Sequence, residues 1–227
     1  MREIRRRWSM RQQISEKAAE DIVNGCTFDN NLPCIAEKEI VAVDSIADEL
    51  LHYMVSEQGC YMISKEEQDA LTEVVLKGGR LNRKCVGRDA KTLLGMIGIT
   101  VPDNIRCITF EGPKEHPLIA EELMMPILGV VRAKDFDDAV EQAVWLEHGN
   151  RHSAHIHSKN VDNITKYAKA IDTAILVKNG PSYAALGFGG EGYCTFTIAS
   201  RTGEGLTSAS TFTKRRRCVM TDSLCIR

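Results

Sequence analysis

The chain has 227 residues, of which 43% are hydrophobic and 26% are charged. This composition is ordinary for a globular protein with one sizeable core or two small ones. The formal net charge of −2 excludes an overall field that would favour nucleic acid or an anionic membrane surface. No apolar run approaches the length needed to cross a bilayer, so no membrane partner is expected.

The first 16 residues form an atypical basic leader. They carry five arginines, at positions 2, 5, 6, 7 and 11, without a clear amphipathic pattern. They also lack the apolar core of a secretory signal. We expect a disordered arm here, and we interpret the arginines as solvated side chains rather than as a nucleic-acid-binding site.

One cysteine, Cys34, lies in a loop of polar residues just ahead of a strand-like run, within the segment FDNNLPCIAEKE at 28–39. A nucleophilic cysteine needs such a setting because its sulfur must be reachable and its thiolate stabilised. Free cysteine is more often a small buried hydrophobe. The loop alone therefore leaves both interpretations open.

The other seven cysteines form no C-x-x-C pair, which argues against zinc ribbons and disulfide scaffolds. We interpret them as packing residues with free thiols in a reducing, cytoplasmic setting. They are at positions 26, 60, 85, 107, 194, 218 and 225.

Strand-like and helix-like blocks alternate after Cys34. Strands are predicted over 40–43, 106–110, 127–131, 154–157 and 174–177. Helices are predicted after the caps Asp44 or Ser45, Ser64 (in a capping box), Asp135 and Asn160, and over 117–124. Helix ends are expected at Gly78–Gly79 and near Gly149.

This alternation indicates parallel strands joined by helical crossovers. We predict an α/β fold with an open, mainly parallel sheet and helices on both faces. Residues 180–213 are rich in Gly, Ser and Thr and are interpreted as an ordered functional loop. The tail from residue 215 to 226 is predicted to be a final strand. The basic run at 214–217 before it is interpreted as a solvated strand face.

A cluster of histidines lies at positions 148, 152, 155 and 157. Strand alternation would put His155 and His157 on one face, as in a metal site. No cysteine or carboxylate completes a familiar ligand spacing, so no metal site is predicted. An active-site role in proton transfer and a partly exposed structural role stay open for this cluster.

Several motifs together resemble the CoA-acylating aldehyde dehydrogenases, with the microcompartment propionaldehyde and acetaldehyde dehydrogenases as the nearest branch. They are the Cys34 segment and the runs ELMMP at 122–126, GNRHSA at 149–154, VKNGPSY at 177–183, GGEG at 189–192 and TGEG at 202–205. The resemblance covers residues 17–227. Hydrolytic aldehyde dehydrogenases carry Gly-Gln-x-Cys, whereas Asn31-Leu32-Pro33 precedes Cys34 here, as in the acylating branch.

The resemblance implies oxidation of propionaldehyde or acetaldehyde to an acyl-CoA through a cysteine thioester. It implies NAD as hydride acceptor and coenzyme A as co-substrate. Cys34 would be the nucleophile, and His152 would help to deprotonate or position the CoA thiol. Glu122 would contact the nicotinamide ribose, although the residue type alone favours an exposed helix carboxylate. The implied substrate pocket is lined by Asn30, Pro181, Ser182, Gly189 and Gly190, and a tight structural loop is the equal alternative for the glycines.

The resemblance also implies a catalytic domain over 17–213 and an oligomerisation strand over 214–227 in a homo-oligomer, either cytoplasmic or in a bacterial microcompartment. The family has a Rossmann domain upstream, and this chain contains no glycine-rich phosphate fingerprint. We therefore expect a truncated chain, explained by a frameshift in a longer gene, that lacks dehydrogenase activity alone.

Three other functions stay open at this point. The chain could be a non-catalytic assembly or binding module that docks on full-length homologues. It could be an esterase-like thiol enzyme that uses Cys34 without NAD. A nucleic-acid binder rests only on the arginine arm.

Overall fold

A four-stranded parallel sheet forms the centre of the molecule in the computed structural model, which describes residues 2–191, 194–198, 206–219 and 221. The strand order is β1-β6-β5-β2, and every neighbouring pair is parallel. The strands are β1 (Glu39–Val43), β2 (Cys60–Met62), β5 (Cys107–Glu111) and β6 (Ile127–Ala133). Parallel strands share their amino ends at one edge of the sheet, and the loops that enter β1 and β6 therefore meet there.

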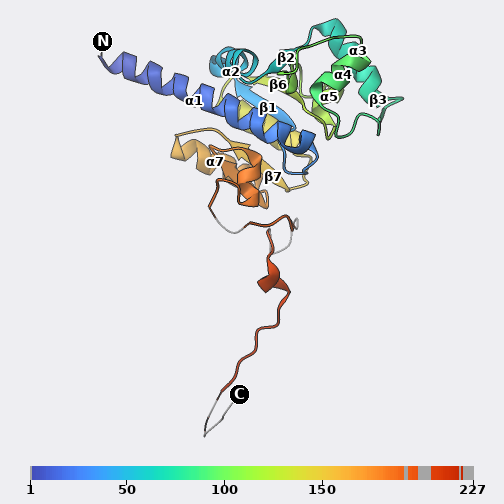
Figure 1. Cartoon of the computed structure of the whole chain (residues 1–227). Helices are drawn as coiled ribbons and strands as arrows, with labels where there is room; N and C mark the ends of the chain where they lie inside the picture. The colour runs from blue at the N-terminus through green and yellow to red at the C-terminus, as the bar shows by residue number, and fades with distance from the viewer. Residues whose placement is uncertain (1, 192–193, 199–205, 220, 222–227) are drawn as a thin grey trace.

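Helices cover both faces of this sheet, which confirms the predicted fold class (Figure 1). The long α1 (Arg2–Thr27) and α2 (Asp44–Ser56) pack on one face. The other face is covered by α3 (Lys65–Val75), α4 (Ala90–Met96) and α5 (Pro117–Ala120). Within the described residues, no helix has the length and apolar character to cross a membrane.

A second, smaller unit lies below α1 in Figure 1. Its two strands, β7 (Ser153–Ile156) and β8 (Ile175–Lys178), pair in parallel apart from the main sheet. The helix α7 (Val161–Ile171) joins them, and α6 (Phe136–Leu146) contacts both α7 and the main sheet. The short helix η2 (Ser182–Leu186) follows β8 and contacts α1.

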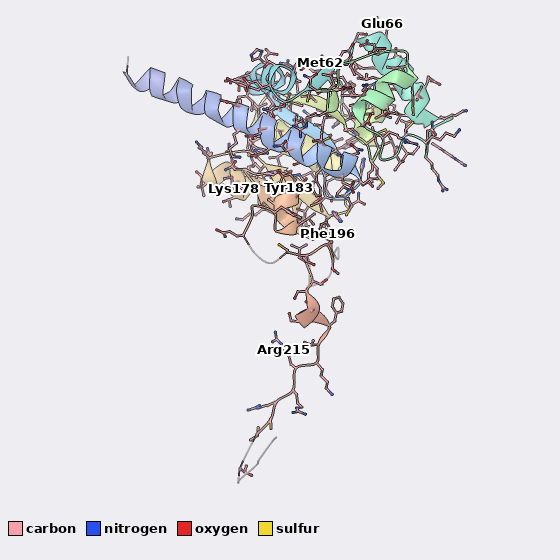
Figure 2. The ribbon with its side chains drawn as sticks, in the orientation of Figure 1. Met62, Glu66, Lys178, Tyr183, Phe196 and Arg215 are labelled. Atoms are coloured by element: carbon pink, nitrogen blue, oxygen red, sulfur yellow. The ribbon has the colours of Figure 1, made fainter. Side chains whose placement is uncertain are left out.

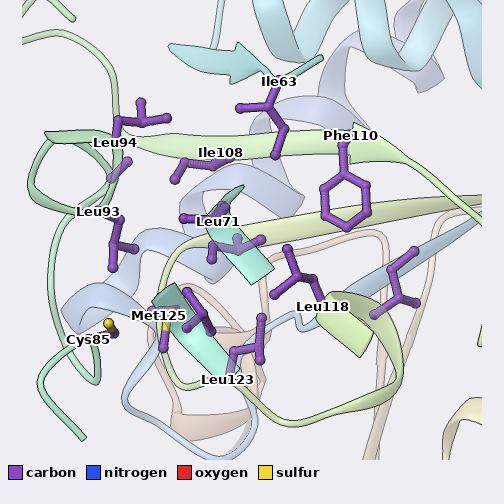
Figure 3. Close-up of a cluster of buried hydrophobic side chains, with 14 of the residues drawn as sticks. Ile63, Leu71, Cys85, Leu93, Leu94, Ile108, Phe110, Leu118, Leu123 and Met125 are labelled. Carbon is purple, nitrogen blue, oxygen red and sulfur yellow. The ribbon is translucent and has the colours of Figure 1, made fainter. Parts of the chain in front are cut away.

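The central strands are buried on both faces, as parallel strands between helical layers must be. Along β6, Ile127 and Val131 enter one hydrophobic cluster, while Leu128 and Val130 enter the cluster beneath α1 and α2. Figure 3 shows the first cluster, in which Phe110 of β5 is fully buried between the sheet and α5.

Five α-helices of the described part begin at side chains that accept backbone hydrogen bonds, and α5 is one of them, because His116 accepts from the Leu118 N–H. Ser64 forms the predicted capping box with Glu67, and Asp135 and Asn160 cap α6 and α7 as predicted. Asp89 caps α4 in the same way. The predicted cap of α2 is wrong, because Asp44 is already helical and Val43 occupies the cap position without a side-chain hydrogen bond.

Two predicted helix boundaries also differ. The helix expected over 117–124 ends at Ala120, because Glu121 is extended and Met124 has a positive φ of 54°. Gly78 and Gly79 do not end α3 but form the turn of a hairpin between β3 (Leu76–Lys77) and β4 (Arg80–Leu81), where both glycines have positive φ.

The two ends of the chain differ from expectation as well. Residues 2–16 form the first turns of α1 rather than a disordered arm, since this stretch is rich in helix-forming Arg, Gln, Glu and Met. The predicted final strand is not seen over 214–219 or at 221, while 220 and 222–227 lie outside the described residues. Figure 2 shows Arg215 on a tail that extends away from the body.

The fold generates a test at Gly129 of β6. A Cβ added there would overlap the side chain of Ile119 and lie 3.2 Å from Phe110, both of them buried. Gly129→Ala should therefore lower the free energy of unfolding by about 1–3 kcal/mol, measured by urea denaturation.

Gly95 of α4 provides the matched control, because a Cβ there meets no atom within 4 Å. Gly95→Ala should raise the free energy of unfolding by about 0.5–1 kcal/mol through helix propensity. Equal effects of the two substitutions would contradict the packing described for β6.

Candidate functional site

The loop that carries Cys34 begins with an unusual backbone. Asp29, Asn30 and Asn31 have positive φ values of 48°, 49° and 65°. Asn and Asp are the non-glycine residues that adopt this left-handed conformation most readily, and runs of it are costly for L-residues. Such conformations persist only where surrounding contacts hold them, and they cluster at functional sites.

The buried side chain of Asn31 provides those contacts. Its Nδ2 donates to the carbonyl oxygens of Cys26 (3.0 Å) and Glu37 (2.8 Å), on either side of the loop. Its Oδ1 accepts from the ammonium of Lys38 at 2.7 Å. The loop is thus closed on itself across the position of Cys34.

The side chain of Cys34 is exposed. The residue lies in a turn that the Ala36 N–H closes onto the Pro33 carbonyl at 3.0 Å. Among the described residues, none accepts a hydrogen bond from the Cys34 backbone N–H. Both the sulfur and the adjacent amide are therefore available to a ligand.

The Sγ of Cys34 lies 3.5 Å from Nε2 of His152. His152 precedes β7, and its backbone N–H donates to Oε1 of Glu147 at 3.1 Å. Its Nδ1 lies 3.2 Å from the Ser153 hydroxyl. If Nδ1 carries the proton and donates to that hydroxyl, the lone pair of Nε2 faces the sulfur, as a general base requires.

The carboxylate of Glu122 reaches the same loop through Lys38. Glu122 lies in the segment between α5 and β6, and its side chain is 57% exposed. The Lys38 Nζ lies 3.7 Å from its Oε1. An exposed carboxylate beside the Cys34 loop has the chemistry to accept hydrogen bonds from the hydroxyl groups of a ribose.

Glu37 fixes the start of η2 against the cysteine loop. The residue is 5% exposed, and its Oε1 accepts from the backbone N–H of Ser182 at 2.8 Å. Its Oε2 is buried without a hydrogen-bond partner among the described residues, and the carboxyl group packs against the backbone of Gly25. Burial raises the pKa of Glu37 to about 7.

Glu39, the first residue of β1, has a similar environment. Loss of solvent around its carboxyl raises the pKa of Glu39 to about 7, with the ammonium of Lys38 opposing and Glu122 and Glu147 adding to the rise. Two acidic side chains close to the cysteine loop therefore hold their protons to near neutral pH.

An aromatic-walled cavity of about 530 Å³ adjoins the start of the loop. The rings of Phe28, Tyr183 and Phe188 form one wall, with Phe28 lying 5.4 Å from Tyr183 and 6.1 Å from Phe188. The guanidinium of Arg106 lines it as well, held by Asn24 and Thr27 at 2.8 Å each. This hollow is open to solvent, and its lining combines the three rings with the polar side chains of Asn24, Asp29 and Arg106.

The predicted pocket residues take different positions. Asn30 donates to the Gly87 carbonyl at 3.1 Å, so its amide braces the loop. Ser182 is 2% exposed, and Pro181 is half-buried as the cap of η2. Gly189 and Gly190 are exposed next to Phe188, and a side chain at Gly190 would meet the Ala184 carbonyl at 2.5 Å.

His155 of β7 and His157, which follows that strand, have an environment different from that of His152. Burial lowers the pKa of His155 to about 4, with His157 adding to the effect, and both Nε2 atoms are buried without a hydrogen-bond partner among the described residues. Burial also lowers the pKa of His157, whose Nδ1 is 3.9 Å from the buried Asp21. No three His, Cys, Asp or Glu side chains of the described part group as metal ligands would.

The prediction that the remaining cysteines pack in the core is confirmed for Cys26, Cys60, Cys85 and Cys107, which are buried. It is wrong for Cys194 and Cys218, which are exposed because they follow the last buried helix, η2. Cys225 lies outside the described residues.

A second hollow, of about 480 Å³, lies at the opposite edge of the sheet. It is lined by Arg132, whose guanidinium pairs with Glu111, Asp44 and Asp48. Because Glu111 ends β5 whereas Cys34 precedes β1, this hollow is separate from the cysteine site.

The structure thus places His152 beside Cys34, although 118 residues separate them, and it links Glu122 to the Cys34 loop through Lys38. Sequence reasoning missed Glu37 and Lys38, which lie three and four residues after Cys34. It also missed the wall formed by Phe28, Tyr183 and Phe188. The charged pair in the run Ala36-Glu37-Lys38 just before a buried strand was a signal for them, since buried charges require partners.

The chain is similar to several known proteins. The model of the aldehyde dehydrogenase family matches residues 104–213. The acetaldehyde dehydrogenase (acetylating) EutE of Salmonella typhimurium is 46% identical over 213 residues, covering 91% of this chain and 45% of EutE. The chain spans about half the length of the curated relatives it matches.

Two solved structures are similar as well. The propionaldehyde dehydrogenase from the Clostridium phytofermentans fucose utilisation microcompartment has 82% identity and a TM-score of 0.88, covering 94% of this chain and 49% of that one. The Rhodopseudomonas palustris propionaldehyde dehydrogenase with bound propionyl-CoA has 56% identity and a TM-score of 0.87, covering 91% and 46%.

The buried carboxyl of Glu37 generates a pH prediction. Its pKa is raised in the folded state, so its contribution to stability is fully present below about pH 4.5 and is lost as pH rises to about 7. Between these limits, wild type should lose up to about 3 kcal/mol of unfolding free energy relative to Glu37→Gln.

The quantity to measure is the unfolding free energy of wild type minus that of Glu37→Gln at each pH, from urea denaturation. The difference is needed because His155 changes the stability of both proteins with pH in the opposite direction. The pKa of His155 is lowered to about 4, so its own contribution to stability rises with pH. A Glu37→Gln curve that runs parallel to wild type from pH 4.5 to 7.5 would contradict the protonated carboxyl.

Proposed function

We propose that this chain, a close homologue of the CoA-acylating aldehyde dehydrogenases over about half of their length, carries the thioester chemistry of that reaction. The substrates would be propionaldehyde or acetaldehyde and coenzyme A, and the product an acyl-CoA. The names of the relatives support both aldehydes, and the bound propionyl-CoA of one relative supports the CoA partner.

The contact between Cys34 Sγ and His152 Nε2 at 3.5 Å carries the proposal. A thiol and an imidazole at this distance can exchange a proton, which is the arrangement that activates cysteine nucleophiles. The exposed sulfur admits a substrate, and the half-buried imidazole is oriented by Ser153 and Glu147.

In the first half of the reaction, the Cys34 thiolate attacks the aldehyde carbon. A C–S bond forms and the carbonyl electron pair moves to oxygen, giving a thiohemiacetal oxyanion. The unpaired N–H of Cys34 is positioned to donate to that oxyanion. Glu122 would hold the ribose of NAD, which would supply the hydride acceptor for this carbon.

In the second half, His152 takes the proton of the CoA thiol. The CoA sulfur attacks the thioester carbon, the bond to Cys34 breaks, and Cys34 leaves as a thiolate. A thiolate serves in both halves because it attacks well and also leaves well. Among the remaining groups, the wall of Phe28, Tyr183 and Phe188 suits the short apolar tail of the aldehyde.

The assembly and location of the protein belong to the same proposal. Homo-oligomerisation through residues 214–227 and residence in a bacterial microcompartment or the cytoplasm rest on the resemblance, and the relative from a fucose utilisation microcompartment supports the location. Glycines 189 and 190, with Pro181, would form the entrance, because their backbone is exposed beside Phe188.

The direct test is the acylation of Cys34 by propionyl-CoA, which needs no nicotinamide. Incubation of the purified 227-residue chain with propionyl-CoA should add one propionyl group to Cys34, located by peptide mass spectrometry, and release an equal amount of free CoA. Cys34→Ser should abolish both the uptake of the propionyl group and the release of CoA, because a serine hydroxyl is a far weaker nucleophile than a thiolate.

Cys194 provides the internal control, since it is exposed without a histidine at its sulfur among the described residues. Propionylation spread equally over Cys34 and Cys194 would indicate non-specific chemistry. A chain that is folded by circular dichroism but takes up no propionyl group would refute the proposed function.

The role of His152 has its own test. His152→Ala should slow the transfer of the propionyl group from Cys34 to CoA by about 10²-fold or more, because the general base is removed. The fall should shrink when the assay pH is raised, since the CoA thiol then ionises without help. A rate unchanged from wild type, with intact folding, would show that His152 is structural.

A further inference from the structure

The ammonium group of Lys38 lies at the centre of the site without a part in the reaction described above. It donates to the Asn31 carbonyl (3.1 Å), to the Asn31 Oδ1 (2.7 Å) and to the Pro33 carbonyl (3.4 Å). All three acceptors lie in the four residues that lead to Cys34. The side chain is 16% exposed, so these bonds compete little with water.

These bonds act on the strained part of the loop. Asn31 is the last of the three left-handed residues, and Lys38 holds both of its oxygens. Hydrogen bonds from a charged donor are stronger than neutral ones. Lys38 is therefore the group best placed to keep the turn at Pro33 and Cys34 in its observed orientation.

The same ammonium reaches Glu122 at 3.7 Å, on the segment that enters β6. A second tie runs parallel to it, because Asn30 donates to the Gly87 carbonyl and the Gly87 N–H donates to the Met124 carbonyl at 2.9 Å. The loop of the nucleophile and the loop of Glu122 are thus joined twice.

The Lys38 ammonium interacts electrostatically with both Glu122 and Cys34. Burial lowers the pKa of Lys38, and the negative charges of Glu122, Cys26 and Cys34 oppose that lowering. The carboxyl of Glu39 interacts with it as well. Glu122 and the Cys34 thiolate are both attracted to the one Lys38 ammonium. A change in the charge at Glu122 therefore alters the attraction between Lys38 and Cys34, and the reverse also holds.

The geometry points to Lys38 as a positioning residue that couples the nucleophile to Glu122. Its ammonium holds the Cys34 loop in place and stabilises the thiolate form of Cys34. The ion pair with Glu122 weakens this stabilisation, because the carboxylate partly neutralises the positive charge. A ligand whose hydroxyl groups engage Glu122 would then release the ammonium toward Cys34. The inference rests on the proposed function for the identity of the nucleophile.

The test measures the rate at which iodoacetamide alkylates Cys34 between pH 5.5 and 9.5, resolved by peptide mass spectrometry with Cys194 as internal reference. This rate follows the thiolate population and needs no aldehyde, CoA or NAD. The imidazole of His152 lies at the sulfur, and the Lys38 ammonium interacts with Cys34 electrostatically. His152 is unchanged in all variants.

Lys38→Met should slow Cys34 alkylation at pH 7 about three- to tenfold and raise the midpoint of the pH–rate curve, because a nearby positive charge is removed. Lys38→Arg should retain most of the rate. Lys91→Met is the matched control, because the exposed Lys91 of α4 pairs with Asp103 and, among the described residues, bonds to no residue of the Cys34 loop.

Glu122→Gln supplies the decisive comparison. It should speed the alkylation of Cys34 in the wild-type background and lose most of this effect in the Lys38→Met background, since the coupling passes through Lys38. An equal effect of Glu122→Gln in both backgrounds would overturn the coupling. An unchanged midpoint in Lys38→Met would overturn the positioning role.

Glu122 is exposed, so Glu122→Gln is expected to fold even if Lys38→Met does not, and a Glu122→Gln variant with wild-type kinetics would then overturn the inference on its own. The outcomes are separable from those of the proposed function. A Cys34 that accepts a propionyl group yet ignores Lys38 would remove only this inference.

Discussion

The site depends on one buried amide, that of Asn31. Three successive residues before Cys34 adopt a left-handed backbone that ordinary sequence would not maintain. The Asn31 side chain makes that path stable by joining Cys26 and Glu37 across the loop, and its oxygen accepts from Lys38. Without this bridge, the turn that presents the Cys34 sulfur has no fixed relation to the sheet behind it.

A second constraint is the packing of the small β7–β8 unit against the main sheet. Cys34 precedes β1 of the main sheet, and His152 precedes β7 of the small one. The small unit is held against the main body by α6, by the contact of η2 with α1, and by the buried bond from Ser182 to Glu37. The 3.5 Å approach of sulfur to imidazole is therefore a tertiary property, set by how these units pack.

The sequence predicted the fold class, because buried parallel strands and capped helices leave clear local patterns. Ser64, Asp135 and Asn160 cap their helices as predicted. The patterns failed where tertiary contacts override propensity. At 121–126, Leu123 and Met125 turn into the core and break the expected helix, while Pro126 disfavours a helical Met125.

Some residues of the site were predicted from the sequence and others were not, for a physical reason. Motif resemblance named Cys34, His152 and Glu122. The structure places His152 beside Cys34 and links Glu122 to the Cys34 loop through Lys38. It gave no role to Lys38 or Glu37, since their importance comes from burial and from partners that are distant along the chain, such as Ser182. Ser182 itself was expected to face a substrate but is covered, and its backbone N–H is directed to Glu37.

The central claim is that packing has made the sulfur of Cys34 an activated nucleophile. The most direct measurement is a competition in which a limiting amount of iodoacetamide is offered to the folded chain at pH 7, and the modification of each cysteine is counted by peptide mass spectrometry. The account predicts that Cys34 reacts on the order of tenfold faster than Cys194 and Cys218. Those two thiols are also exposed, and among the described residues no imidazole lies at either sulfur. Equal modification of the three cysteines would contradict it.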